Sequence, residues 1–98
     1  MSEVILHEDA EEEFEAAQLW HLSHSKRSAE RSTRAVRRIA EEALGNPTRY
    51  PEYDAEFREA GMTDYPYSVI YRALPSGDVQ VIAVAHASRQ PGYWRDRA

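Results

Sequence analysis

The tripeptide Gly45-Asn46-Pro47 divides the chain into two parts that differ in residue periodicity. Glycine commonly ends a helix and proline cannot continue one, so a helix is expected to stop here. Before this point apolar residues recur at helical spacing. After it, the apolar stretches are rich in aromatic and β-branched residues. Helices followed by strands predict an α+β protein in which one sheet carries a pair of helices on one face.

Two helices are predicted before this break, over residues 9–23 and 27–45. Asp9 is the predicted N-cap of the first helix, and the acidic residues that follow it suit the positive end of a helix dipole. The link between the helices is short, which is typical of an αα-hairpin. The residues expected to face the core are Ala10, Phe14, Ala17, Trp20 or His21, and His24 in the first helix, and Ala29, Ser32, Val36, Ile39 and Ala43 in the second.

Strands are predicted on both sides of the helix pair. A short apolar run at Val4–Leu6 precedes the helices, and a turn with the sequence Pro-Ser-Gly-Asp at residues 75–78 is typical of a hairpin. Composition predicts four further segments: a loop over 48–54, a strand or a helix over 55–60, and strands over 65–73 and 79–87. The predicted order is therefore a strand, two helices and a three-stranded antiparallel meander, followed by a basic, aromatic tail.

The size and composition of the chain indicate one globular unit. A chain of 98 residues predicts a single domain over residues 1–98, and 42% hydrophobic with 30% charged residues is typical of a soluble domain. The absence of cysteine excludes disulfides and thiolate metal sites. No run of about 18 apolar residues occurs, and the N-terminus lacks the features of a secretory signal. The cytoplasm is the expected location, and no membrane partner is predicted.

The formal net charge of −5 disfavours nonspecific binding to nucleic acid, because phosphates repel a net anion. The charge is unevenly distributed, however. Residues 1–15 hold seven acidic and no basic side chains, whereas residues 26–38 hold six basic side chains and one acidic one. The arginine-bearing surface of the second helix is therefore either solvated or a site for an acidic segment of a partner.

Four stretches of the chain carry a recognisable pattern. They are the acidic start of the first helix with Phe14, the helix end at 43–47 (ALGNP), the strand at 65–72 (YPYSVIYR), and 81–86 (VIAVAH) followed by 88–94 (SRQPGYW). Together these stretches resemble the RelE/ParE toxin superfamily, in the subgroup of plasmid stabilisation proteins. The resemblance implies a β-α-α-β-β-β fold with an antiparallel meander, an N-terminal strand and an αα-hairpin packed on one face. It also implies a type II toxin–antitoxin system, growth inhibition and a cognate antitoxin.

The resemblance leaves the cellular target open. RelE-like members cut mRNA on the ribosome, and ParE-like members inhibit DNA gyrase by binding it. An endoribonuclease would here use the basic and acid–base residues Arg58, Arg72, His86, Arg89 and Tyr93. Ser68 stands where RelE-like sequences tend to have arginine, and residues 48–60 hold four carboxylates that would oppose an RNA phosphate. These departures favour ParE-like inhibition of gyrase. The alternatives are a ribosome-dependent mRNA endoribonuclease and an inactive member that only binds its antitoxin.

The antitoxin is expected to lay a helix or an extended segment in an apolar groove near the helix pair and the sheet edge, forming a hetero-oligomer. Its candidate contacts are Phe14, Trp20, Val36 and Trp94. Structural interpretations compete with these roles, since a histidine at a strand end can simply be hydrogen-bonded, an arginine on a strand can be solvated, and the tail can pack on the sheet. The pair His21 and His24 has no third ligand in the sequence pattern, so neither a metal nor a cofactor is predicted.

Overall fold

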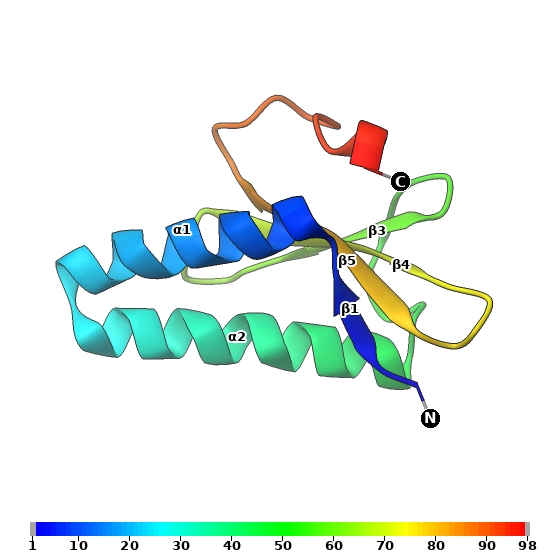
Figure 1. Ribbon diagram of the computed structural model, residues 1–98, viewed down its shortest axis with the longest axis horizontal. Helices are drawn as coiled ribbons and strands as arrows, with labels where there is room; N and C mark the ends of the chain where they lie inside the picture. The colour runs from blue at the N-terminus through cyan, green and yellow to red at the C-terminus, as the bar shows by residue number, and fades with distance from the viewer. Residues whose placement is uncertain (1, 98) are drawn as a thin grey trace.

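The computed structural model describes residues 2–97 and shows a sheet with two long helices (Figure 1). In chain order the elements are β1 (Val4–Leu6), α1 (Glu8–His24), α2 (Lys26–Gly45), β2 (Glu52–Asp54), β3 (Phe57–Gly61), β4 (Tyr67–Ala73), β5 (Val79–His86) and the short 3₁₀ helix η1 (Arg95–Arg97). The predicted α+β class, N-terminal strand and αα-hairpin are confirmed. Within residues 2–97, neither helix has the length and apolar character needed to cross a bilayer.

The five strands form one mixed sheet in the order β1-β5-β4-β3-β2. Strands β3, β4 and β5 are the predicted antiparallel meander, and β1 lies parallel to β5 at one edge. The prediction of a loop over 48–54 was wrong for residues 52–54, which form β2 and pair with β3 across a turn. That turn places Ala55 at a φ of 49°, a left-handed conformation that only tertiary context makes acceptable for alanine. A three-residue edge strand also has too few positions to show an alternating pattern.

Local hydrogen bonds explain where the helices begin and end. The predicted N-cap at Asp9 was wrong, because α1 begins one residue earlier and His7 is its cap. The Nδ1 atom of His7 accepts a hydrogen bond from the Asp9 backbone N–H at 3.0 Å. Helix α2 follows after a single residue, Ser25, whose hydroxyl oxygen accepts from the Ser28 N–H at 2.9 Å. The predicted stop at Gly45 is confirmed.

The helices cover one face of the sheet and form the larger core with it. This core contains Ala10, Val36, Ile39, Ala43, Ala60, Met62, Val69, Tyr71, Val79 and Val81. The sequence left open whether Trp20 or His21 of α1 faces the core. His21 does, since only 1% of its surface is exposed, whereas Trp20 is half exposed. The Tyr71 hydroxyl donates to the Pro47 carbonyl at 2.8 Å, which ties the end of the helix pair to the sheet.

The opposite face of the sheet carries a smaller apolar cluster that the C-terminal tail covers. Its buried members are Phe57, Ile70, Ile82, Ala83 and Trp94. Figure 1 shows the tail arching from the end of β5 over the side of the sheet away from α2. The Trp94 ring is 2% exposed and meets the rings of Phe57 and Tyr53 edge-on, with centroids 4.8 and 5.1 Å away. The sheet therefore has a core on each face, and the tail supplies the central side chain of the second.

Candidate functional site

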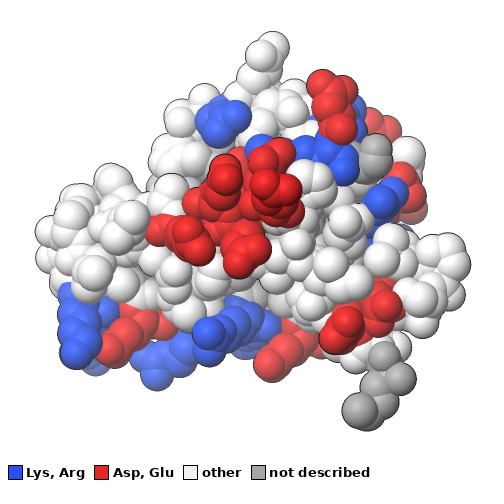
Figure 2. Space-filling view, in the orientation of Figure 1, with Lys and Arg blue, Asp and Glu red and all other residues white. Residues whose placement is uncertain are grey.

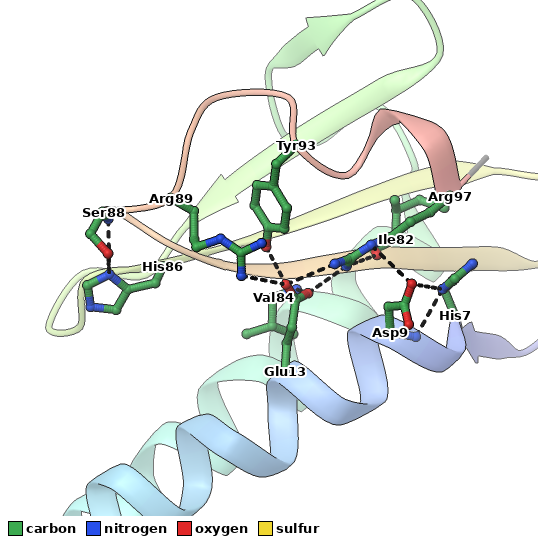
Figure 3. A network of polar contacts seen from close by, with 10 residues as sticks. All are labelled: His7, Asp9, Glu13, Ile82, Val84, His86, Ser88, Arg89, Tyr93 and Arg97. Carbon is green, nitrogen blue, oxygen red and sulfur yellow. Dashed lines mark hydrogen bonds and ion pairs between the residues drawn. The ribbon is translucent and has the colours of Figure 1, made fainter.

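Glu13, on the first half of α1, is the centre of a network of polar contacts that joins α1 to the C-terminal tail and to β5 (Figure 3). Its carboxylate accepts two bonds from the Arg97 guanidinium, at 2.7 and 3.2 Å, and one from the Tyr93 hydroxyl. Arg89 lies 3.9 Å away and completes the ring of tail residues around it. The side chains of Glu13 and Arg97 are only 15% and 14% exposed, so this ion pair is largely shielded from water.

The position of this cluster follows from the end of β1. Strand β1 stops at Leu6, whereas β5 continues to His86, so the later part of the β5 edge has no neighbouring strand. Glu13 accepts a hydrogen bond from the Val84 N–H at 3.1 Å, and Arg97 donates to the Ile82 carbonyl at 3.0 Å. Backbone groups at a buried edge need partners. The Glu13–Arg97 pair supplies them where a further strand residue would otherwise stand.

Within the cluster, the surroundings of Tyr93 and Arg97 favour the protonated forms of these two side chains. Burial, and then the hydrogen bond to Glu13, raise the pKa of the Tyr93 phenol far above its usual value. The hydrogen bond to Glu13 likewise raises the pKa of Arg97. Arg89 lies over the Tyr93 ring, 3.9 Å from its centroid. Tyr93 is thus a protonated donor whose hydroxyl is already occupied. This role of Glu13 could not be predicted from the sequence, because its partner Tyr93 lies 80 residues away.

The candidate arginines Arg58 and Arg72 lie on opposite faces of the sheet. Arg58 is paired across the ladder with Tyr71, whose side chain belongs to the helix-side core, and Arg72 is paired with Phe57 beneath the tail. Each guanidinium meets a carboxylate, at 3.5 Å from Glu52 for Arg58 and at 3.1 Å from Glu56 for Arg72. These two side chains therefore cannot act on one phosphate.

The other three candidates, His86, Arg89 and Tyr93, line one small cavity of about 160 Å³ between the tail and the sheet. Small-molecule sites usually enclose about 300–1,000 Å³. His86 is turned away from the Glu13 cluster (Figure 3), and its Nδ1 atom accepts a hydrogen bond from the Ser88 N–H at 3.0 Å. Its ring packs edge-on against Tyr67. The cavity thus collects three of the five residues, but Arg89 and Tyr93 are directed to Glu13, whereas the Nδ1 atom of His86 is bound to Ser88.

The four candidate antitoxin contacts do not share a surface. Val36 is 7% exposed in the helix-side core, Trp94 is 2% exposed under the tail, and Phe14 is half-buried against the helix-side core. Trp20 is 51% exposed on α1. The sequence analysis missed Leu19 and Leu22, which are 68% and 52% exposed. Their departure from the core-facing spacing of α1 was the signal that could have identified them.

Leu19 and Leu22 line a groove of about 750 Å³ on the outer side of the αα-hairpin. Ala29 adds an apolar residue on α2, where the charged residues Lys26, Glu30 and Arg34 also line the groove, and Glu15 lines it on α1. Figure 2 shows acidic side chains gathered over the first half of α1 and a row of basic side chains along α2. Four basic side chains have no carboxylate within 4.0 Å among residues 2–97, and all are on α2: Lys26, Arg27, Arg34 and Arg37.

Comparison with known proteins agrees with this architecture. The sequence profile of the ParE toxin of type II toxin–antitoxin systems (ParDE) matches residues 4–91. No curated protein matches the chain in sequence. Among solved structures, the chain is similar to one described as "Chromosomal ParDE TA system from P. aeruginosa", at 15% identity and a TM-score of 0.60. The alignment covers 88% of this chain and 96% of that one, and at such low identity it shows a shared fold.

Proposed function

Because the chain belongs to the ParE toxin family of type II toxin–antitoxin systems, we propose that it arrests growth by binding DNA gyrase and not by cutting RNA. A binding inhibitor needs a folded surface and no acid–base machinery. An endoribonuclease needs cations free to stabilise a phosphorane, and an acid and a base within reach of one phosphate.

The neutralised arginines of the sheet and tail carry this proposal. Arg58 is held by Glu52, Arg72 by Glu56, and Arg89 approaches Glu13. A carboxylate at 3–4 Å cancels most of the field that a guanidinium would exert on a phosphate. Arg58 and Arg72 also face opposite sides of the sheet, so they cannot support a common site.

The acid–base candidates favour the same conclusion. The Tyr93 hydroxyl donates to Glu13, and the raised pKa of Tyr93 makes its loss of a proton unfavourable near neutral pH. The His86 Nδ1 atom already accepts from the Ser88 N–H. A general base must reach the proton that it removes. Neither group is positioned to take a proton from a shared substrate in this arrangement.

A gyrase supercoiling assay with the purified protein tests the proposal. Supercoiling is expected to fall as the protein is added, and Arg72→Gln is expected to inhibit as strongly as the unmodified chain, because the guanidinium of Arg72 is paired with Glu56. Unaltered supercoiling at excess protein would refute gyrase as the target.

The endoribonuclease alternative makes a different prediction in a translating extract. Primer extension on mRNA is expected to give no new cleavage products when the protein is added. If cleavage appears and Arg89→Ala or His86→Ala abolishes it, the RNA-cutting function is correct and the binding function is not. An inactive family member would leave both assays unchanged and would also leave growth normal when expressed without an antitoxin.

The groove on the αα-hairpin suits an antitoxin helix. Its apolar residues Leu19, Leu22 and Ala29 would accept an apolar stripe, and on the α2 side two basic residues, Lys26 and Arg34, outnumber Glu30 and would favour acidic residues beside that stripe. Such a helix would contact Leu22, an exposed residue that lines the groove. Co-expression with the product of an adjacent antitoxin reading frame is therefore expected to restore growth.

A charge in the groove tests this placement. Leu22→Asp is expected to remain toxic but to escape rescue by the antitoxin, because a carboxylate would be desolvated against an apolar helix. Thr63→Asp, which introduces the same carboxylate at an exposed position outside the lining of the groove, serves as the control. Equal rescue of both variants would place the antitoxin elsewhere.

A further inference from the structure

The C-terminal residues 89–97, here called the tail strap, are attached by side chains to the face of the sheet that they cover. At the start of the strap the Arg89 N–H donates to the His86 carbonyl at the end of β5, and the other backbone hydrogen bonds run within the segment: Tyr93 N–H to Gln90, Arg95 N–H to Gly92 and Arg97 N–H to Trp94. The strands beneath it are joined by backbone ladders from β3 to β5, with one register shift in the β4–β5 ladder between Ile70 and Tyr71. A segment without ladder bonds can leave a sheet while the sheet stays intact. The profile match to the ParE toxin ends at residue 91, before the anchoring side chains of the strap.

Three attachments hold the strap, and they differ in strength. Trp94 fills the apolar slot on the sheet. Arg95 pairs with Asp54 at 2.8 Å, but both side chains are nearly half exposed, so solvent screens this pair. The third attachment is the shielded cluster in which Glu13 binds Tyr93 and Arg97, and Arg97 also donates to the Ile82 carbonyl at 3.0 Å. Without the Glu13 contacts, Trp94 would be the one large apolar side chain left to offset the conformational entropy that the nine residues of the strap lose on ordering.

Glu13 is the point at which these attachments depend on one another. Its carboxylate meets three strap side chains and the Val84 N–H of β5 together. Asp9 also faces Arg97, at 3.6 Å, but it is half exposed. Removing the charge of Glu13 therefore weakens several strap contacts at once and leaves Arg97 poorly compensated beside the sheet.

We propose that the tail strap opens and closes as a unit over a sheet that stays folded, and that Glu13 is the residue that keeps it closed. Opening uncovers Phe57, Ile70 and Ile82 and releases Arg89 and Arg97 from the carboxylate. The face of the sheet away from the helices is thus covered or exposed by a switch that acts through one side chain of α1. This device is independent of the target that the protein binds.

Amide hydrogen exchange measured by NMR on the full chain tests the proposal. In Glu13→Gln the amides of Tyr93, Arg95 and Arg97 are expected to exchange about 10-fold faster or more, while those of Val69 and Ile70 change less than about threefold. Glu12→Gln is the matched control, because it removes the same charge one residue away, from an exposed side chain. It is expected to leave both sets of amides unchanged.

Two results would overturn the proposal. Equal acceleration of the strap and β4 amides in Glu13→Gln would mean that the strap and the sheet unfold together. Unchanged strap amides would mean that Glu13 does not hold the strap. If Glu13→Gln does not fold, exchange in the unmodified chain tests the proposal. Its strap amides are expected to exchange at least 10-fold faster than the β4 amides. Low concentrations of urea are not expected to accelerate the strap amides, because opening the strap exposes much less surface than global unfolding does. Equal rates there would refute the strap.

Discussion

Replacing Val36 by alanine is expected to destabilise the protein, although Val36 lies on the helix that carries the basic surface. Its side chain is 7% exposed and packs between α2 and the sheet. The change removes two methyl-sized groups, worth about 1.6 kcal/mol at roughly 0.8 kcal/mol per buried group. The cavity left behind adds to this, giving a loss of about 2 kcal/mol in the free energy of unfolding.

A loss of this size is readily measured in a protein of 98 residues. It corresponds to a fall in Tm of roughly 8–16 °C, because 1 kcal/mol shifts Tm by about 4–8 °C in a domain of this size. Urea unfolding followed by circular dichroism gives the free energy directly. The slope with urea concentration is expected to stay unchanged, since the substitution removes packing and not surface exposed on unfolding.

The matched control is Leu19→Ala, which truncates an aliphatic side chain on the solvent side of α1. Leu19 is 68% exposed, so its loss is expected to cost less than about 0.5 kcal/mol. The reasoning would be refuted if Leu19→Ala cost as much as Val36→Ala, or if Val36→Ala cost under about 0.5 kcal/mol. Either result would mean that the faces of the αα-hairpin are assigned wrongly.

Three further changes probe other parts of the structure. Tyr71→Phe removes the buried donor to the Pro47 carbonyl and is expected to cost about 1 kcal/mol in urea unfolding; no loss would show that water replaces the bond. Burial, and then the charge of a neighbouring histidine, lower the pKa of His21 below its ordinary value of 6.5, so the unfolded chain binds a proton that the folded chain does not. Stability is therefore expected to decrease as pH falls below about 6.5, and His21→Phe is expected to reduce this dependence; identical pH profiles for the two proteins would contradict it. Arg72→Gln is expected to leave growth arrest intact, and restored growth at equal protein level would implicate Arg72 in the target interaction.

Much of the secondary structure could be predicted because its causes are local. The stop at Gly45 depends on residues within one turn of the helix, and the meander depends on apolar stretches joined by short turns. Two local predictions were wrong, the N-cap of α1 at Asp9 and the loop over residues 52–54, because another residue or a neighbouring strand offered a more favourable hydrogen-bonding partner. His7 caps α1 in place of Asp9, and β2 forms only because β3 is there to pair with it.

The sequence analysis could name the residue types of the candidate site, but it could not predict how those side chains are placed relative to one another. Arg58 and Arg72 were grouped because both are basic strand residues, but alternation along their strands sends them to opposite faces. Trp94 and Val36 were grouped as apolar, yet they belong to cores on different sides of the sheet. Residue type indicates what a side chain can do, whereas its register in the sheet decides what it can reach.

The sequence by itself determined the order and kind of the elements, the hairpin of helices and the family, since periodicity, caps and turns act over a few residues. Only the tertiary structure decided the parallel pairing of β1, the burial of Trp94 and the convergence of Tyr93 and Arg97 on Glu13. The physical reason is distance along the chain. Partners about 80 residues apart leave no mark on local periodicity, and their pairing becomes favourable only when the folded sheet removes both groups from water.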